Sequence, residues 1–306
     1  MKAFYCDQFV LPLPETHSFP MAKYRKLRER VLSDAIIDAR SLIEPPAASF
    51  DQLTLAHHSA YVDDVFEGRL TAEHQRRIGF PWSPGMVERS RRSVGGTIAA
   101  ARLAREEGAA VNLAGGTHHA FRDRGSGYCV FNDIAVAARV MRLEAEIAGR
   151  ATPRIAVVDC DVHQGDGTAS IFRNDPTVFT LSLHGEKNFP FRKETSDLDV
   201  MLPDGVRDAE YLDRLSAALD QVLARHEPDF IFYLAGADPY EGDRLGRLKL
   251  TIEGLQARDR LVVARCAPLP IAACMGGGYC RDVDVIAEIH ANTVREVSRA
   301  ESVVRS

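Results

Sequence analysis

The sequence lacks the features that mark secreted and membrane-spanning proteins. Its six cysteines include no Cys-x-x-Cys pair, and several lie in apolar segments, as free thiols do in a reducing compartment. The N-terminal residues Met1 to Cys6 lack the long apolar stretch of a signal peptide, and no apolar run approaches the length that spans a bilayer. We therefore expect a cytoplasmic protein that has no membrane partner.

A strong excess of either charge is also absent. The 306 residues carry a formal net charge of −5, and the isoelectric point is near 6.1. This balance argues against a nucleic-acid partner, which is bound through phosphate contacts, and it mildly favours cationic over anionic partners. Hydrophobic residues make up 45% of the chain, which is enough for one large core. With no repeats or linkers, we expect residues 1–306 to form a single domain.

Strands and helices are expected to alternate along the chain. Apolar runs predict buried strands at 3–6, 111–114, 155–158, 178–184, 229–234 and 269–274. Helices are predicted at 21–31, 84–107, 132–148, 211–226 and 251–265, and from 281 to the C-terminus. This alternation indicates an α/β protein with a mainly parallel sheet flanked by helices.

Three further segments carry chemically suggestive side chains without a clear site. Residues 55–64 contain paired histidines and paired aspartates, which we interpret as a helical and mostly structural segment. The basic residues of the 21–31 helix favour a solvated face over nucleic-acid binding. The loop 79–84 holds the only tryptophan, Trp82, either at a pocket rim or in simple packing. Ser83 is expected to cap the following helix, with Pro84 at its first position and Gly95-Gly96 allowing a close approach.

The chemistry is concentrated directly after the apolar run 155–158. Asp161 and His163 are two residues apart, so their side chains point the same way in extended backbone, and together they form half of a divalent-metal site. Asp159 has the same phase and is placed to orient a neighbouring group. The alternative is a strand end with solvated carboxylates and a glycine turn. The density of ionisable groups favours the metal site.

Four predicted strand ends deliver such residues to one edge of the sheet, where ligands bind in open α/β folds. Asp161, His163 and Asp238 leave one coordination position open for water, as in catalytic rather than structural zinc sites. The adjacent His118 and His119 are expected to diverge, which suits acid/base work better than shared metal binding. Asp159 and Asp166 are the spare acids that would fix their tautomers, and Tyr279, after three glycines, would donate to an oxyanion.

These motifs, taken in order along the chain, resemble the zinc-dependent histone deacetylase family. The motifs are Gly-Gly-Thr-His118-His119, Asp159-x-Asp161-x-His163-Gln-Gly-Asp166-Gly-Thr, Ala-Gly-Ala-Asp238-x-x-x-Gly-Asp243 and Gly-Gly-Gly-Tyr279. Details such as Gly242-Asp243-Arg244-Leu245-Gly246 are most similar to the class IV branch and its bacterial relatives. The resemblance implies the arginase/deacetylase fold, a three-layer α/β domain with a mainly parallel sheet of about eight strands. It also implies that residues 1–306 form one catalytic domain.

The resemblance also implies a role for each matching residue. Zinc would be bound by Asp161, His163 and Asp238. His119, paired with Asp166, would be the general base and then the acid, and His118, paired with Asp159, would stay charged. Tyr279 would stabilise the oxyanion. The acyl-lysine tunnel and its surroundings would include Gly127, Tyr128, Phe189, Leu245 and Gly277. A structural potassium ion would lie among Asp159, Asp161, His163, Ser182 and Leu183.

Two departures bear on the substrate. A rim aspartate that grips the substrate backbone in better-known members is replaced in the region 80–83, and Leu245 stands where polyamine deacetylases have a glutamate. The leading hypothesis is hydrolysis of an acetyl or longer acyl amide on a lysine-like amine, in a protein, a peptide or a small molecule. The alternatives are an acetylpolyamine deacetylase, a two-manganese ureohydrolase and a degenerate binding module. The last predicts loss of Tyr279 or a histidine of the pair, and all are present. Acyl-chain length and oligomeric state stay open.

Overall fold

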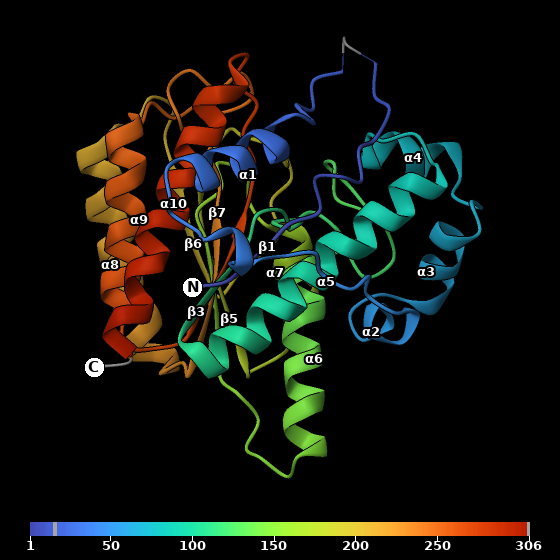
Figure 1. The fold of residues 1–306 in the computed structure, drawn as a ribbon, viewed down its shortest axis with the longest axis horizontal. Helices are drawn as coiled ribbons and strands as arrows, with labels where there is room; N and C mark the ends of the chain where they lie inside the picture. The colour runs from blue at the N-terminus through green and yellow to red at the C-terminus, as the bar shows by residue number, and fades with distance from the viewer. Residues whose placement is uncertain (15–16, 305–306) are drawn as a thin grey trace.

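The buried apolar runs of the sequence form the centre of one eight-stranded sheet. The computed structural model describes residues 1–14 and 17–304, and its strand order is β2-β1-β3-β8-β7-β4-β5-β6 (Figure 1). All neighbouring strands are parallel. The strands are β1 (Ala3–Phe4), β2 (Leu42–Ile43), β3 (Ala109–Asn112), β4 (Ile155–Asp159), β5 (Val178–Gly185), β6 (Leu198–Leu202), β7 (Phe230–Ala235) and β8 (Ile271–Met275). The predicted parallel sheet is confirmed.

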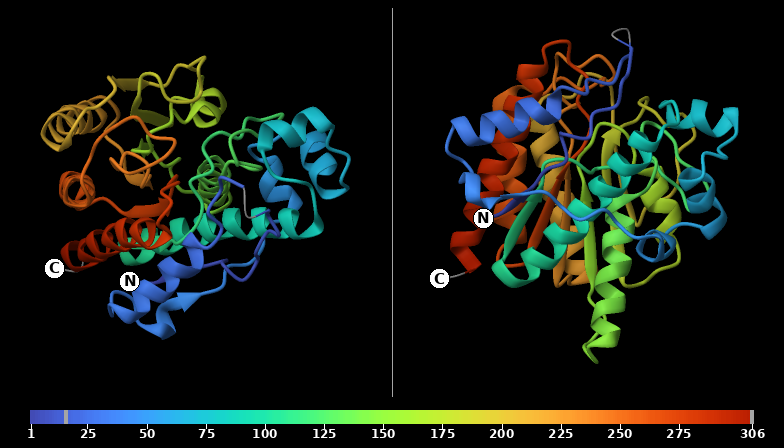
Figure 2. Two further views of the ribbon diagram at one scale, coloured as in Figure 1. Left: turned by 90° about the horizontal axis from the view of Figure 1, so that it is seen from above. Right: turned by 45° about the vertical axis from the view of Figure 1, so that its right-hand side comes forward.

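Helices cover both faces of this sheet. They are α1 (Lys23–Ser33), α2 (Phe50–Thr54), α3 (Ser59–Phe66), α4 (Ala72–Ile78), α5 (Pro84–Glu107), α6 (Asp133–Ile147), α7 (Asp166–Phe172), α8 (Asp208–His226), α9 (Ile252–Cys266) and α10 (Val283–Val304). Figure 1 shows α8, α9 and α10 on one side and α2 to α6 on the other, and the right-hand view of Figure 2 shows the strands between them. None of the described helices is both long and apolar enough to cross a membrane.

The central strand β4 shows why its sequence is apolar throughout. Ala156 and Val158 belong to the hydrophobic cluster under α1, α8, α9 and α10, whereas Ile155 and Val157 belong to the cluster under α5 and α6. Because alternate residues of a strand point to opposite faces, a strand covered on both sides needs apolar residues at every position. The end of β4 is therefore held rigidly in the middle of the molecule.

The predicted elements agree with the structure at the long, buried segments and fail at the short ones. The edge strands β2 and β6 were not predicted. Strand β2 has only two residues, and β6 is only partly buried, so neither contains an apolar run. The short helices α2, α4 and α7 were also missed. The last two residues of the predicted C-terminal helix lie outside the described residues. Ser83 caps α5 as expected, and Pro46 approaches Gly95 so closely that a Cβ there would lie 1.8 Å from its carbonyl oxygen.

Two of the suggestive segments prove structural, and one prediction is wrong. The Trp82 indole donates to the carbonyl of Val65 at 2.7 Å, so it anchors the loop to α3 rather than lining the pocket. Helix α3 begins only at Ser59, so the paired histidines lie in the turn before it. The expectation of a solvated helix face fails at Lys23, which is only 3% exposed.

His57 ties two distant segments together as a buried neutral imidazole. Its Nδ1 lies 2.8 Å from the carbonyl oxygen of Phe121, and its Nε2 accepts the N–H of Asn132 at 2.9 Å. This arrangement requires a proton on Nδ1 and none on Nε2. Burial lowers the pKa of His57 to about 4, from its usual 6.5.

Stability should therefore fall in acid through His57. Below pH 6.5 the unfolded chain protonates His57, whereas the folded chain protonates it only near pH 4. The contribution of His57 to the unfolding free energy is therefore complete above pH 6.5 and is lost as pH falls toward 4. The difference in unfolding free energy between the wild type and His57→Gln should shrink by roughly 1.4 kcal/mol per pH unit in this window. Urea denaturation at several pH values measures it. His58→Gln, at the exposed neighbour, is the control, and a pH-independent difference for His57→Gln would contradict the assignment.

Candidate active site

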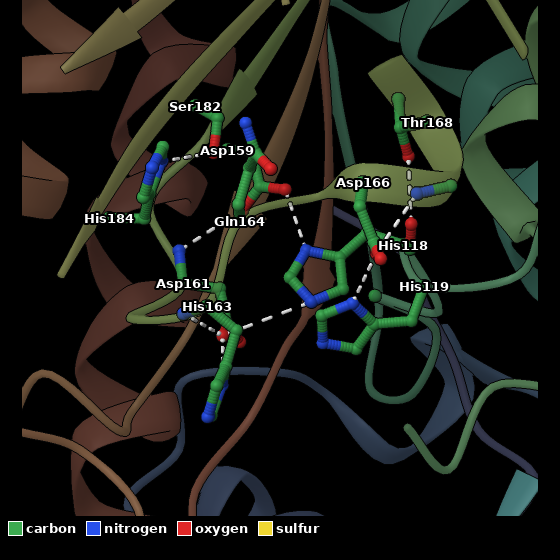
Figure 3. Close-up of polar contacts among 12 residues, drawn as sticks. His118, His119, Asp159, Asp161, His163, Gln164, Asp166, Thr168, Ser182 and His184 are labelled. Carbon is green, nitrogen blue, oxygen red and sulfur yellow. Dashed lines mark hydrogen bonds and ion pairs between the residues drawn. The ribbon is translucent and has the colours of Figure 1, made fainter. Parts of the chain in front are cut away.

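The loops that follow β3, β4, β7 and β8 meet at the carboxyl edge of the sheet and bring the predicted residues together. Because β8, β7 and β4 are consecutive neighbours, the loop residues Asp161, Asp238 and Gly277 lie side by side. His118 and His119 arrive from the loop after β3. Figure 3 shows the two histidine rings facing the cluster that follows β4.

Asp161, His163 and Asp238 form a buried cluster in which one ligand atom from each lies within 4.8 Å of the others. His163 Nδ1 is 2.9 Å from Asp161 Oδ1 and 3.2 Å from Asp238 Oδ2. The expected extended backbone is wrong here. The chain bends at 161–163, and this bend brings the two side chains together.

The cluster fits a divalent cation. The Oδ2 atom of Asp238 is buried and has no hydrogen-bond donor, and burial together with the Asp161 carboxylate raises the pKa of Asp238 to about 7. A cation would relieve both penalties. Gly277 donates its N–H to Asp161 Oδ2 at 2.6 Å, and a Cβ at this glycine would lie 1.8 Å from Asp238 Oδ2. Two carboxylates and one imidazole are a donor set suited to zinc.

A second metal position of the kind a ureohydrolase needs has no support among the described side chains. The cluster above is the one group there with three or more metal-capable residues close enough to share an ion. Asp243 has a different task. It accepts the N–H of Tyr279 at 2.6 Å and that of Leu245 at 2.8 Å, and so joins the phenol-bearing loop to the pocket rim.

The two histidines have different partners and different charges. His118 Nδ1 is 2.7 Å from Asp159 Oδ2, and His119 Nδ1 is 2.6 Å from Asp166 Oδ1 (Figure 3). Burial opposes charge on His118, but the Asp159 and Asp161 carboxylates outweigh it and raise its pKa to about 9. Burial and the neighbouring His118 cation lower the pKa of His119 to about 4. Near neutral pH the pair therefore consists of one cation and one neutral base.

The prediction that these rings diverge is wrong. Their centroids are 4.1 Å apart and their planes are inclined by 54°. Asp159 lies at the end of β4 and Asp166 in the first turn of α7, so two carboxylates from one short segment hold the rings close. Neither histidine belongs to the metal-capable cluster.

Tyr279 stands across the pocket from these groups. Its ring centroid is 6.2 Å from that of His163, and it is 7% exposed. Burial and the Asp238 carboxylate raise the pKa of its phenol well above the ordinary value, so the hydroxyl keeps its proton and remains a donor. The guanidinium of Arg244 donates to the Tyr279 carbonyl at 2.6 Å and fixes the loop.

A pocket of about 430 Å³ leads from the surface to these groups. It has His119, His163 and Tyr279 among its walls, together with the predicted residues Gly127, Tyr128, Phe189 and Leu245. The Phe189 ring centroid is 4.9 Å from that of His119. Gly277 does not line this pocket but borders a smaller inner cavity beside Asp161.

The residues predicted to surround potassium lie in two adjacent segments. Asp159 and Ser182 are register partners of β4 and β5, and the N–H of Gly185 donates to the carbonyl of Val162 at 2.9 Å. Ser182 Oγ is 3.0 Å from His184 Nδ1, and Leu183 is buried.

Sequence reasoning missed four residues that hold the site in place. Asp133 accepts both the N–H and the hydroxyl of Thr117, at 2.8 and 2.7 Å, and so fixes the loop that leads to His118. Asn132 donates to the carbonyl of Ala120 at 3.2 Å while capping α6. The sequence Asn132-Asp133 at a helix start signals a cap but gives no sign of these distant partners.

Lys23 is the third missed residue and lies behind the pocket. Its Nζ donates to the carbonyl of Gly276 at 3.2 Å and is 5.5 Å from the Tyr279 ring centroid. The aromatic rings of Phe19 and Tyr24 complete its surroundings. A lysine in the first turn of a basic helix carries no signal of this burial.

Arg258 supports the loops of the metal-capable cluster. It is fully buried, and it donates to the carbonyls of Gly236 at 2.6 Å and Cys160 at 3.3 Å, which lead into Asp238 and Asp161. Its charge is balanced by Asp259, which accepts from Arg258 Nε at 2.9 Å. The sequence showed only an arginine in a predicted helix.

Comparison with known proteins decides the family. The histone deacetylase domain model matches residues 17–297. The chain belongs to the histone deacetylase family. It is therefore a deacetylase, an enzyme of the hydrolase class, and the predicted resemblance is confirmed.

Individual relatives agree with this assignment. The deacetylase is 46% identical over 289 residues to an uncharacterised protein of Picosynechococcus sp., covering 94% of this chain and 95% of that protein. It is 29% identical over 304 residues to histone deacetylase 2 of Arabidopsis thaliana, covering 96% and 76%. The crystal structure of a histone deacetylase homologue from Aquifex aeolicus matches with a TM-score of 0.84 at 25% identity, covering 97% and 84%. The expected arginase/deacetylase fold is confirmed.

Replacing Arg258 should destabilise the deacetylase and loosen the loops that carry Asp161 and Asp238. Arg258→Leu leaves Asp259 as an unpaired buried charge, so the unfolding free energy should fall by roughly 3–5 kcal/mol. Chemical denaturation measures this loss. Arg265→Leu, in the same helix but with a side chain 41% exposed and an exposed partner in Asp220, is the matched control and should cost less than about 1 kcal/mol. Equal losses in the two variants would contradict the role given to Arg258.

Proposed function

We propose that this deacetylase uses one zinc ion to hydrolyse an acetyl or longer acyl amide on a lysine-like amine. The observation that carries the proposal is the Asp161–His163–Asp238 cluster, whose His163 lines the same pocket as Tyr279 and His119. The amide would enter acyl group first, with the amine half extending toward the mouth. Phe189 and Tyr128 supply the apolar walls that an aliphatic chain needs.

Zinc would be held by Asp161, His163 and Asp238. When bound, it supplies Lewis acidity that lowers the pKa of a water molecule and polarises the acyl carbonyl. His163 presents the Nδ1 atom to the carboxylates. Gly277 has no side chain and so leaves room for this cradle, the space between Asp161, His163 and Asp238.

His119 is the proton carrier in the proposed reaction. Its Nδ1–H is fixed by Asp166, which leaves the Nε2 lone pair free to take a proton from the attacking water. His119 then gives this proton to the amine nitrogen as the carbon–nitrogen bond breaks. His118 stays positively charged beside Asp159 and stabilises the negative charge that develops nearby. The Tyr279 hydroxyl donates to the carbonyl oxygen as it gains negative charge.

Three further assignments belong to the same proposal. A potassium ion would lie among the backbone oxygens of Asp159, Asp161, His163 and Leu183 and the Ser182 hydroxyl, supported by the adjacency of the two segments. Residues 1–306 would act as one catalytic domain, supported by the single sheet whose strands and following loops hold the site residues. A reducing compartment such as the cytoplasm is supported by the six unpaired cysteines, five of them buried.

Turnover of fluorogenic acetyl-, butyryl- and long-chain acyl-lysine peptides, beside acetylated polyamines, tests the reaction. Tyr279→Phe removes one oxyanion donor and should lower kcat about a hundredfold to a thousandfold. His119→Ala removes the base and should cost about a hundredfold to ten-thousandfold. Tyr240→Phe, the same chemical change outside the pocket, should keep the wild-type rate. Wild-type rates in both site variants would refute the assigned roles.

Metal content tests the cradle independently of turnover. In Gly277→Ala the added methyl group would collide with Asp238 Oδ2, so the purified variant should lose its zinc, measured by elemental analysis after dialysis. Gly85→Ala, whose nearest neighbouring atom would lie at 3.8 Å, should bind one zinc per chain like the wild type. Full zinc occupancy in folded Gly277→Ala would contradict the proposed ligand geometry.

A further inference from the structure

Two arginines line the mouth of the pocket, and none of the acidic side chains that the structure describes does. Arg76 and Arg77 lie in the last turn of α4 and belong to the pocket lining, whose other members are aromatic, aliphatic, small or imidazole-bearing. The chain as a whole carries a net charge of −5, so this local positive charge is not a general property of the surface.

The end of α4 is fastened to the pocket wall by main-chain hydrogen bonds. Gly127 donates its N–H to the carbonyl of Arg77 at 3.0 Å, and Tyr128 donates to that of Ile78 at 2.7 Å. The two arginines are thus built into the same unit as the wall that would surround the substrate. The backbone of Arg76 and Arg77 is therefore fixed relative to the pocket wall.

The two guanidinium groups differ in whether they form an ion pair. Arg77 pairs with Glu73 at 2.7 Å, one turn earlier on the exposed face of α4. The side chain of Arg76 makes no ion pair or hydrogen bond with the described residues. It is therefore an exposed cation that is not neutralised by a described side chain, with five donors available to a ligand.

The other side of the mouth is apolar. Leu245 lines it and is 40% exposed, and Phe191, whose ring centroid is 6.3 Å from that of the lining residue Phe189, is 89% exposed. An acylated amine that reaches the inner end would therefore leave its amine half between an apolar edge and a cationic edge. The arrangement favours an aliphatic stem that ends in an anionic group.

Resting on the proposed function, we propose that this mouth selects acylated amines that carry a carboxylate on the amine half. The smallest such substrate is an Nε-acyl-lysine with a free α-carboxylate, either alone or at the end of a peptide. Arginine binds carboxylates with paired, charge-assisted hydrogen bonds, whereas a polyamine would bring positive charge against positive charge. Arg76 is the principal determinant, and Arg77 shares its charge with Glu73.

Basic residues in a last helical turn also stabilise a helix by opposing its dipole. Arg105 occupies the last turn of α5, which ends where β3 begins, at the opposite edge of the sheet from the pocket. Arg105→Glu therefore reproduces the change in net charge and in helix-end electrostatics without touching the mouth. It is the matched control for Arg76→Glu.

The experiment compares two substrates that differ only at the carboxylate: Nα-acetyl-Nε-acetyl-lysine and its C-terminal carboxamide. The zinc-loaded wild type should show a kcat/KM about three- to tenfold higher for the free acid, expressed mainly in KM. The preference should weaken as ionic strength rises. Arg76→Gln combined with Arg77→Gln should remove it, Arg76→Glu should reverse it, and Arg105→Glu should keep it.

Each outcome decides the proposal. Equal kcat/KM for acid and carboxamide in the wild type, or a preference that survives in the Arg76→Gln/Arg77→Gln variant, overturns the selectivity while leaving the deacylase function intact. Failure of the wild type to hydrolyse either compound and every acyl-lysine peptide overturns both. Circular dichroism melting of each variant verifies that it is folded, so that a lost preference reports recognition.

Discussion

The structure depends on keeping four carboxylates buried in one small volume beyond the ends of β4 and β7. Asp159, Asp161, Asp166 and Asp238 are each at most 5% exposed. Burying one isolated carboxylate costs several kcal/mol or more, so four of them require positive charge or hydrogen-bond donors in contact. Asp159 faces the His118 cation and Asp166 faces the neutral His119 ring. Asp161 and Asp238 converge on His163 in a cluster that fits a divalent cation. The contacts that offset the burial of these carboxylates are the same contacts that shape the candidate active site.

The long buried elements and the metal-capable cluster could be predicted from sequence because they carry local signals. An apolar run with no polar alternation marks β4, and the charged residues after it cannot belong to the core. Each of the four site loops also follows a strand in the chain, so a parallel sheet necessarily gathers them at one edge. The sheet order was not needed for that conclusion.

What could not be predicted depends on contacts distant in sequence. Arg258 reads as an ordinary helical residue, and only the packing of α9 under β4 and β7 turns it into a support for the ligand loops. Lys23 belongs to a basic helix whose other charges face solvent. The close approach of the His118 and His119 rings follows from two carboxylates on a different loop. Overall charge likewise predicted a mild preference for cationic partners, whereas the pocket mouth is locally positive, because specificity depends on the few groups at the opening.

The position of β8 has a consequence for how the molecule is made. This strand comes last among the eight described strands along the chain, yet it lies in the interior of the sheet between β3 and β7. Until residues 271–275 leave the ribosome, β3 and β7 have facing, unpaired edges, which are open to association with other chains. Pairing of β8 closes the sheet, and the same step brings Gly277 beside Asp161 and Asp238.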